Sequence, residues 1–211
     1  MLTIICSSKG GAGTTVVAAA VALARAEQHG RSLLLDMCGD SRPVLGMADT
    51  DSPGLNDWLG EAHTSGADGL LALGEQATER LLVVHPGSRF VSGAPRWAEL
   101  AAALDGCDFP VVIDAGTHFV PDELRSAAGH TWLVTRPCYL SLRRAVRGPR
   151  PTGAVVVRDE GRALTVRDVE SVLNVPVVAT VPVDSAVARA VDAGLLADRW
   201  QDLFGRLLPS G

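Results

Sequence analysis

The sequence contains almost no lysine. Its basic residues number 19, and all of them are arginines except Lys9, which lies inside a glycine-rich segment near the start of the chain. Positive charge is not in excess either, because the formal net charge is -5. That balance argues against a surface built throughout to hold nucleic acid, although a local basic patch is compatible with it.

Cysteine and long apolar runs are scarce as well. The four cysteines lie far apart without C-x-x-C spacing, and no secretory leader precedes them, so we expect a reduced, cytoplasmic setting. No apolar run approaches the roughly 18 residues that a membrane-spanning helix needs. The segment "TTVVAAAVALARA" is short, rich in alanine and followed by charge.

What the sequence does contain is a regular alternation of strand and helix patterns. Its 211 residues, 47% of them hydrophobic, suffice for one core, and we expect one domain over 1–211. A helix pattern over 14–30 follows the first strand pattern, and another covers 165–174. Continuous apolar strand patterns occupy 2–6, 32–36, 81–87, 109–116, 131–137, 153–159 and 176–182. Continuous apolar strands separated by helices predict an α/β fold, with a mostly parallel twisted β-sheet and helices on both faces.

Polar side chains follow several of these predicted strands. In sheets of this kind, ligands bind outside the carboxyl ends of the strands, where Asp36, Asp114, Arg136 and Arg158 fall. The region 37–80 is the longest connection, and its sequence indicates a surface helix and an irregular turn.

The segment "ICSSKGGAGTTVV", residues 5–17, has the character of a phosphate-binding loop. Gly10, Gly11 and Gly13 allow successive N–H groups to converge on an anion, and the following helix adds its positive end. Thr15 occupies the position whose hydroxyl would coordinate Mg²⁺. The alternative interpretation is a plain glycine-rich turn. Lysine is absent from the usual position before Thr15, where Thr14 stands.

These residues resemble the deviant Walker A loop, KGGxGK[ST], of the ParA/MinD group of P-loop ATPases. Lys9 matches the signature lysine that reaches across a dimer, and "LLLDMCGD", "VVIDAG" and "ATVPVDSAVARAVDAG" resemble later family segments. The resemblance implies bound ATP and Mg²⁺ and a homodimer formed through a nucleotide sandwich. It assigns phosphate contacts to one run of residues: Gly10, Gly11, Ala12, Gly13, Thr14 and Thr15. "SPGLNDWL" and the arginine-rich composition resemble the atypical TadZ/CpaE and septum-site-determining-like subset.

Departures from the family pattern predict weak or absent hydrolysis. Thr14 replaces the lysine that would neutralise phosphate charge in the transition state. The family pattern D-x-D implies two acids after the second strand, but here Asp36 is followed by Cys38, which cannot position water in the same way. Asp40 could substitute only if the loop rearranges. Lys9, Asp36 and Asp40 are therefore the candidate catalytic residues.

The resemblance assigns further roles at later strand ends. Asp114 would anchor Mg²⁺ together with Thr15; the alternative is an acid that caps the next turn. Gly116 resembles a switch glycine that senses the terminal phosphate, although "GTHF" follows it where the family has a proline nearby. Arg158 and Pro182 fall where the family contacts the base. Because the expected asparagine is absent, the preference for ATP over GTP rests on resemblance alone.

Two surfaces could contact partners. Four arginines cluster in "LRRAVRGPRP" and could neutralise DNA phosphates, or could simply form a solvated helix end: Arg143, Arg144, Arg147 and Arg150. The C-terminal segment 195–208 carries an apolar helical stripe that could anchor to a membrane, as in MinD-like proteins. Its polar face mixes Asp198 and Asp202 with arginines, which favours docking on the protein body or on a partner.

Three functional hypotheses follow. The first is an ATP-binding dimeric switch that positions another cellular assembly, with a protein partner or cargo and with little hydrolysis. The second is an active ATPase that drives partitioning of DNA or other cargo. The third is a nucleotide-free scaffold that keeps only the fold.

Overall fold

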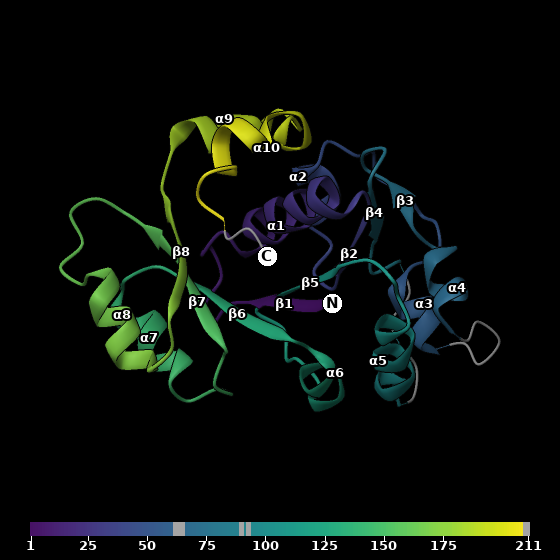
Figure 1. Cartoon of the computed structure of the whole chain (residues 1–211), viewed down its shortest axis with the longest axis horizontal. Helices are drawn as coiled ribbons and strands as arrows, with labels where there is room; N and C mark the ends of the chain where they lie inside the picture. The colour runs from purple at the N-terminus through teal and green to yellow at the C-terminus, as the bar shows by residue number, and fades with distance from the viewer. Residues whose placement is uncertain (61–65, 89–90, 92–93, 209–211) are drawn as a thin grey trace.

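The computed structural model describes residues 1–60, 66–88, 91 and 94–208. Within these residues, eight strands form one sheet in the order β3-β4-β2-β5-β1-β6-β7-β8 (Figure 1). Neighbouring strands pair in parallel, except that β3 is antiparallel to β4 at one edge. The strands are β1 (Leu2–Cys6), β2 (Ser32–Asp36), β3 (Glu75–Gln76), β4 (Leu81–Val84), β5 (Val111–Gly116), β6 (His130–Thr135), β7 (Gly153–Arg158) and β8 (Val177–Pro182).

Helices cover both faces of this sheet, as Figure 1 shows. One face carries α1 (Thr14–His29), α2 (Ser41–Val44), α9 (Ser185–Asp192) and α10 (Leu196–Phe204). The other carries α3 (Leu55–Gly60), α4 (Gly66–Leu71), α5 (Trp97–Asp105), α6 (Asp122–Ala127), α7 (Tyr139–Ala145) and α8 (Val166–Leu173). This arrangement confirms the predicted α/β fold with a mostly parallel sheet.

The continuous apolar strand patterns result from burial on both faces. In β1, Ile5 packs in the core beneath α1, whereas Ile4 packs in the core on the opposite side. In β2, Leu34 likewise packs on the α1 side and Leu33 on the opposite side. None of these four side chains is exposed. Since both faces need apolar residues, the alternation expected of a half-exposed strand disappears.

The patterns over 2–6 and 32–36 match β1 and β2, but several later strands are shorter than their apolar patterns predicted. The pattern over 81–87 ends as β4 at Val84, before Pro86, and the pattern over 131–137 ends as β6 at Thr135, before Pro137. The pattern over 109–116 begins as β5 only after Pro110. Proline has no N–H group to donate to a neighbouring strand, so a strand pattern that includes proline overestimates the paired length.

The prediction for residues 37–80 was wrong in part. Instead of one surface helix and a turn, the described residues there form α2, α3, α4 and the edge strand β3. Helix α3 is not a surface element, because Trp58 and Leu55 are buried in the core against α5 and the sheet. The guanidinium of Arg96 also stacks over the Trp58 ring at 4.7 Å.

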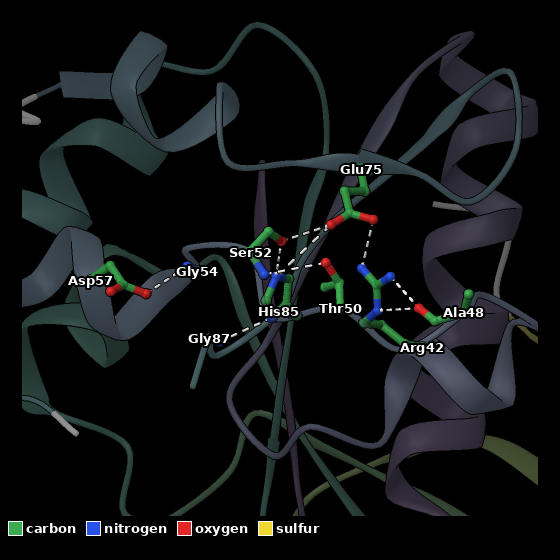
Figure 2. Close-up of polar contacts among 9 residues, drawn as sticks. All are labelled: Arg42, Ala48, Thr50, Ser52, Gly54, Asp57, Glu75, His85 and Gly87. Carbon is green, nitrogen blue, oxygen red and sulfur yellow. Dashed lines mark hydrogen bonds and ion pairs between the residues drawn. The ribbon is translucent and has the colours of Figure 1, made fainter. Parts of the chain in front are cut away.

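A polar cluster in which Arg42 and His85 are buried and Ser52 and Glu75 are partly exposed joins this segment to the edge of the sheet. Figure 2 shows Arg42, Ser52, Glu75 and His85 facing one another. Arg42 Nη1 lies 2.8 Å from Glu75 Oε2, and the Ser52 hydroxyl donates to Glu75 Oε1 at 2.9 Å. The Gly87 N–H donates to His85 Nδ1, so the imidazole proton sits on Nε2 and is directed to Ser52 Oγ. These contacts tie the segment after α2 to β3 and to the residue that follows β4.

This cluster predicts a loss of stability in mild acid. Burial lowers the pKa of His85 below its ordinary value of 6.5, the Arg42 charge lowers it further, and the Glu75 charge opposes both. Because the unfolded chain then binds a proton at this residue more readily than the folded one, His85 contributes a decline in the free energy of unfolding as the pH drops through 6.5, whereas Asp114, whose pKa is raised to about 6, contributes in the opposite direction. His85→Gln is expected to reduce this decline, measured by urea unfolding at several pH values. Equal declines in both proteins would contradict the prediction.

The C-terminal helix packs on the protein body. Leu196 and Phe204 of α10 are buried in the core beside α1, and Trp200 and Leu203 pack against the same cluster. Much of the apolar stripe predicted from the sequence is therefore used inside the fold. Across the part of the chain that the structure describes, every helix is too short or too polar to span a bilayer.

Candidate functional site

Strand order places a candidate site at the carboxyl ends of β1, β2 and β5. Strand β1 lies between β5 and β6. The chain crosses from β1 to β2 on the β5 side and later crosses from β5 to β6 on the other side of β1, which makes this position a topological switch point. The register sets Asp114 of β5 beside Asp36 of β2 on one side and Ile5 of β1 on the other. Two carboxylates thus meet next to the glycine loop that follows β1.

The glycine loop itself is shaped to receive an anion. Gly11 and Gly13 have φ values of 75° and 89°, a left-handed conformation that glycine adopts without steric cost, and Gly13 forms the N-cap of α1. Within the described residues, no N–H group of 10–15 donates a hydrogen bond to the protein. These donors and the start of α1 together form a positively polarised cradle.

The loop borders an open hollow of about 330 Å³. Three segments line it: the loop and first turn of α1, the connection after β2, and the connection after β5. The lining residues are Gly10, Gly11, Gly13, Thr14, Thr15, Val16, Cys38, Asp40, Gly116, Thr117 and His118. Most of the residues predicted from the sequence to contact phosphate therefore surround one space.

Asp36 lies beneath this hollow and organises its wall. Its side chain has no exposed surface, and its two oxygens accept hydrogen bonds from three backbone N–H groups of the following loop. Oδ1 accepts from Cys38 at 2.7 Å and Gly39 at 2.9 Å, and Oδ2 accepts from Ser41 at 2.9 Å. The carboxylate therefore fixes the turn that leads into α2, with Asp40 as the N-cap of that helix.

Asp114 is equally buried but is not fully paired. Its Oδ1 accepts from the Gly116 N–H at 3.0 Å, whereas its Oδ2 is buried and has no hydrogen-bond partner in the described chain. Burial raises the pKa of Asp114 to about 6, and the charges of Asp36 and Asp40 also raise it, while the Thr15 hydroxyl and the Gly116 N–H lower it. An unpaired buried carboxylate oxygen beside a threonine hydroxyl fits a hard cation such as Mg²⁺.

Sequence reasoning missed a cysteine–histidine contact in the same wall. Cys38 Sγ lies 3.5 Å from His118 Nδ1, and the thiol also contacts the Asp114 carbonyl oxygen at 3.7 Å. Gly116, whose φ is 50°, makes this approach possible, because a Cβ atom there would collide with Cys38 Sγ. The only signal in the sequence was the unusual "GTHF" after β5.

Lys9 lies on the opposite side of the loop, exposed, at a second and smaller hollow. Arg136 and Arg162 line that hollow with Lys9, and both guanidinium groups pair with Asp159, at 3.2 and 2.9 Å. Sequence reasoning placed Arg136 at a strand end but did not identify Arg162. Three cationic side chains thus border the outer side of the glycine loop.

The other predicted residues lie outside the central hollow. Ala12 is buried in the core below the loop and lines the Lys9 hollow. Arg158 and Pro182 are exposed register partners at the ends of β7 and β8, and neither lines the hollow beside Gly13. Arg158 instead borders a separate hollow of about 600 Å³ formed with the segment that leads into α8.

The four clustered arginines are all exposed, but they do not share one helix. Arg143 and Arg144 belong to the last turn of α7, which ends at Ala145, whereas Arg147 and Arg150 follow in the connection to β7. Arg150 donates to the Asn174 carbonyl oxygen near the end of α8. The cluster therefore covers the end of α7 and the loop beyond it.

A glycine loop at the first strand-to-helix junction of a parallel sheet, with a buried acid at the neighbouring strand end, is the arrangement of P-loop nucleotide-binding folds. A scan against protein-family models finds no match, and neither does a search of curated protein sequences. Solved structures do match over nearly the whole chain.

The chain is similar to a ParA family ATPase from Chlorobium tepidum TLS, with a TM-score of 0.78 and 20% identity over 97% of this chain and 92% of that one. It is also similar to the septum site-determining protein MinD in complex with Mg-ADP from Pyrococcus horikoshii OT3. That TM-score is 0.74, with 20% identity over 95% of this chain and 88% of that one. For a MinC:MinD cell division protein complex from Aquifex aeolicus, the TM-score is 0.71 and the sequence identity 17%, over 100% of this chain and 98% of that one. The chain therefore has the fold of the ParA and MinD P-loop ATPases.

Proposed function

We propose that this chain binds ATP with Mg²⁺ and acts as a dimeric, ParA/MinD-like switch that positions another cellular assembly. The observation that carries the proposal is the cradle of free N–H groups at residues 10–15, open to a hollow that Thr14, Thr15 and Gly116 share. The MinD structure in complex with Mg-ADP supports this choice of ligand, because it has the same fold.

In this proposal, Thr15 and Asp114 hold the Mg²⁺ ion. The unpaired Oδ2 of Asp114 and the nearby Thr15 hydroxyl are oxygen donors of the kind that Mg²⁺ prefers. The bound ion would neutralise phosphate charge. The chain's own groups would orient the phosphates through the loop amides and sense the terminal phosphate through Gly116, which lines the hollow.

We further propose that hydrolysis is weak or absent. Thr14 supplies no charge to the phosphates, and Cys38 stands where the family pattern has its second acid. Of the three proposed catalytic residues, Asp36 acts by holding the loop through its three backbone hydrogen bonds. Asp40 lines the hollow and is the remaining acid there that could position water. A slow switch of this kind suits a landmark or scaffold.

One experiment separates the three functional hypotheses. Binding of a labelled, non-hydrolysable ATP analogue is measured at equilibrium, and phosphate release from ATP is then measured on the same preparation. Binding without steady phosphate release is the expected result. Binding with steady release would favour the active ATPase instead, and absence of binding by the folded chain would leave only the nucleotide-free scaffold.

Lys9 provides the test of the dimer. Lys9→Ala is expected to abolish nucleotide-dependent dimerisation, because the exposed ammonium would no longer reach the partner's phosphates. Analytical ultracentrifugation with and without the ATP analogue measures the change, and Arg143→Ala removes another exposed cation elsewhere as the control. Dimers that persist unchanged in Lys9→Ala would show that the cross-subunit role is wrong.

The remaining assignments stay predictions within this proposal. The MinC:MinD complex supports a protein partner for a chain of this fold, and the resemblance favours a TadZ/CpaE or septum-site-determining-like role. DNA contact would use the exposed arginines at the end of α7. Arg158 and Pro182 would flank the base at the ends of β7 and β8, outside the phosphate hollow.

A further inference from the structure

We propose that Cys38, His118 and Asp114 form a binding site for a divalent transition-metal ion of the zinc class. Asp114 lies near the carboxyl end of β5, and Cys38 and His118 come from the connections after the neighbouring strands β2 and β5. They provide a thiol, an imidazole and a carboxylate at the edge of the phosphate hollow. This set contains nitrogen and sulfur donors, which Zn²⁺ and Co²⁺ accept and Mg²⁺ does not favour.

The distances fit four-coordinate zinc. Cys38 Sγ and His118 Nδ1 are 3.5 Å apart. In a tetrahedral site, Zn–S of about 2.3 Å and Zn–N of about 2.0–2.1 Å place these two donor atoms roughly 3.5–3.6 Å apart. A carboxylate oxygen of Asp114 and one of Asp36 lie with Cys38 Sγ in a group whose members are all within 4.8 Å of one another. His118 is not a member of that group, so its imidazole, which already lies beside Cys38 Sγ, must move toward the Asp114 carboxylate to complete the site.

Asp114 supplies a second observation that a cation belongs here, and because the proposed function assigns the same oxygen to Mg²⁺, the two ions would compete for it. The residue has no exposed surface, its Oδ2 is buried, and that oxygen accepts no hydrogen bond from the described residues. A buried oxygen without a partner is costly unless a cation or an ordered water satisfies it. Asp36 is not needed as a ligand, because its oxygens already accept three backbone hydrogen bonds; it contributes negative charge.

The local backbone is arranged to bring the donors together. Gly116 carries no Cβ atom, and one placed there would occupy the position of the Cys38 sulfur. The Asp36 hydrogen bonds hold the Cys38 backbone in place from the other side. On metal binding, the thiol would lose its contact with the Asp114 carbonyl oxygen and release one proton to solvent.

Three protein ligands leave a fourth position open toward the hollow, where water or a phosphate oxygen could bind. The site shares Asp114 with the magnesium site of the proposed function, but it needs no nucleotide. It would connect the two loops that line the hollow and so make their relative position depend on the metal.

Cobalt absorption tests the proposal directly. The full chain, stripped of metal, reduced and without nucleotide, is titrated with Co²⁺. A near-ultraviolet thiolate-to-cobalt charge-transfer band is expected, saturating at one equivalent, and one equivalent of Zn²⁺ should remove it. Cys38→Ser is expected to abolish the band. His118→Ala should weaken Co²⁺ binding at least about tenfold, since loss of a ligand costs no less than loss of a supporting residue.

Cys107→Ser is the matched control. The Cys107 thiol donates to the Ala103 carbonyl oxygen in α5, away from the proposed site, so this variant should leave the band unchanged. Circular dichroism confirms that each variant is folded. A folded chain that gives no band, or a band of full strength in Cys38→Ser, would overturn the metal site. Binding of the ATP analogue to the same preparations tests the proposed function separately, so that either idea can fail alone.

Discussion

Replacing Thr14 with lysine is expected to raise the rate of phosphate release from saturating ATP by about 10²- to 10³-fold. Thr14 begins α1 and lines the hollow in which the proposed function places the phosphates of ATP, so a lysine there could extend its ammonium toward them. One well-placed positive group typically stabilises a phosphoryl or acyl transition state by a few kcal/mol, which corresponds to that gain in rate. Steady-state release of phosphate measures the effect.

The matched control for this prediction is Thr14→Gln, which adds length and polarity without charge. It should leave the rate of phosphate release within about threefold of the wild-type value, since a neutral amide stabilises phosphate charge much less than an ammonium does. If Thr14→Lys behaves like Thr14→Gln, the slow hydrolysis results from more than the missing charge. The next substitution to test would then be Cys38→Asp, which restores the second acid of the family pattern.

The fold was predictable because strong local patterns agreed with each other. Apolar runs such as Leu33 to Leu35 must be covered on both sides, and the helix patterns between such runs supplied the cover. Strand β3 was missed because its two residues, Glu75 and Gln76, are polar and too few to show any period. Its pairing depends on long-range contacts, such as the ion pair from Arg42 to Glu75.

The candidate site was predictable where residues are adjacent in sequence and not where they meet only in space. The loop from Gly10 to Thr15 is one continuous motif, and the structure arranges it around one hollow. Cys38 and His118, in contrast, are 80 positions apart, and their contact depends on the register of β2 with β5 and on the open space at Gly116. A single sequence carries no pattern that pairs them.

The role of Asp36 shows a further limit of motif reasoning. The family pattern places an acid at this position and suggests catalysis, but a pattern of residue types does not say where the carboxylate oxygens point. In the structure both oxygens accept hydrogen bonds from the backbone of the next residues, and Asp36 itself does not line the hollow. Asp36 therefore stabilises the loop after β2. Its replacement should change the stability of the chain even when no ligand is bound.

Asp36→Ala is expected to lower the free energy of unfolding by about 3–5 kcal/mol. The substitution leaves three backbone N–H groups without their acceptor, and hydrogen bonds to a charged group contribute about 1.5–3 kcal/mol each, with losses that are not additive. Asp36→Asn should lower the free energy of unfolding by less, because its amide oxygen still accepts hydrogen bonds from the loop, although its NH2 group cannot accept from the remaining backbone N–H. Urea unfolding followed by circular dichroism gives the values.

Asp122→Ala serves as the control, since that carboxylate is 89% exposed and should change stability by less than about 0.5 kcal/mol. If Asp36→Ala unfolds at the same urea concentration as the wild-type chain, the loop after β2 is held by other contacts and Asp36 is free to serve in catalysis. If it unfolds earlier, loss of nucleotide or metal binding in this variant reflects a displaced loop wall. Only substitutions that leave Asp36 in place, such as those at Thr14 and Cys38, then report on the chemistry of the hollow.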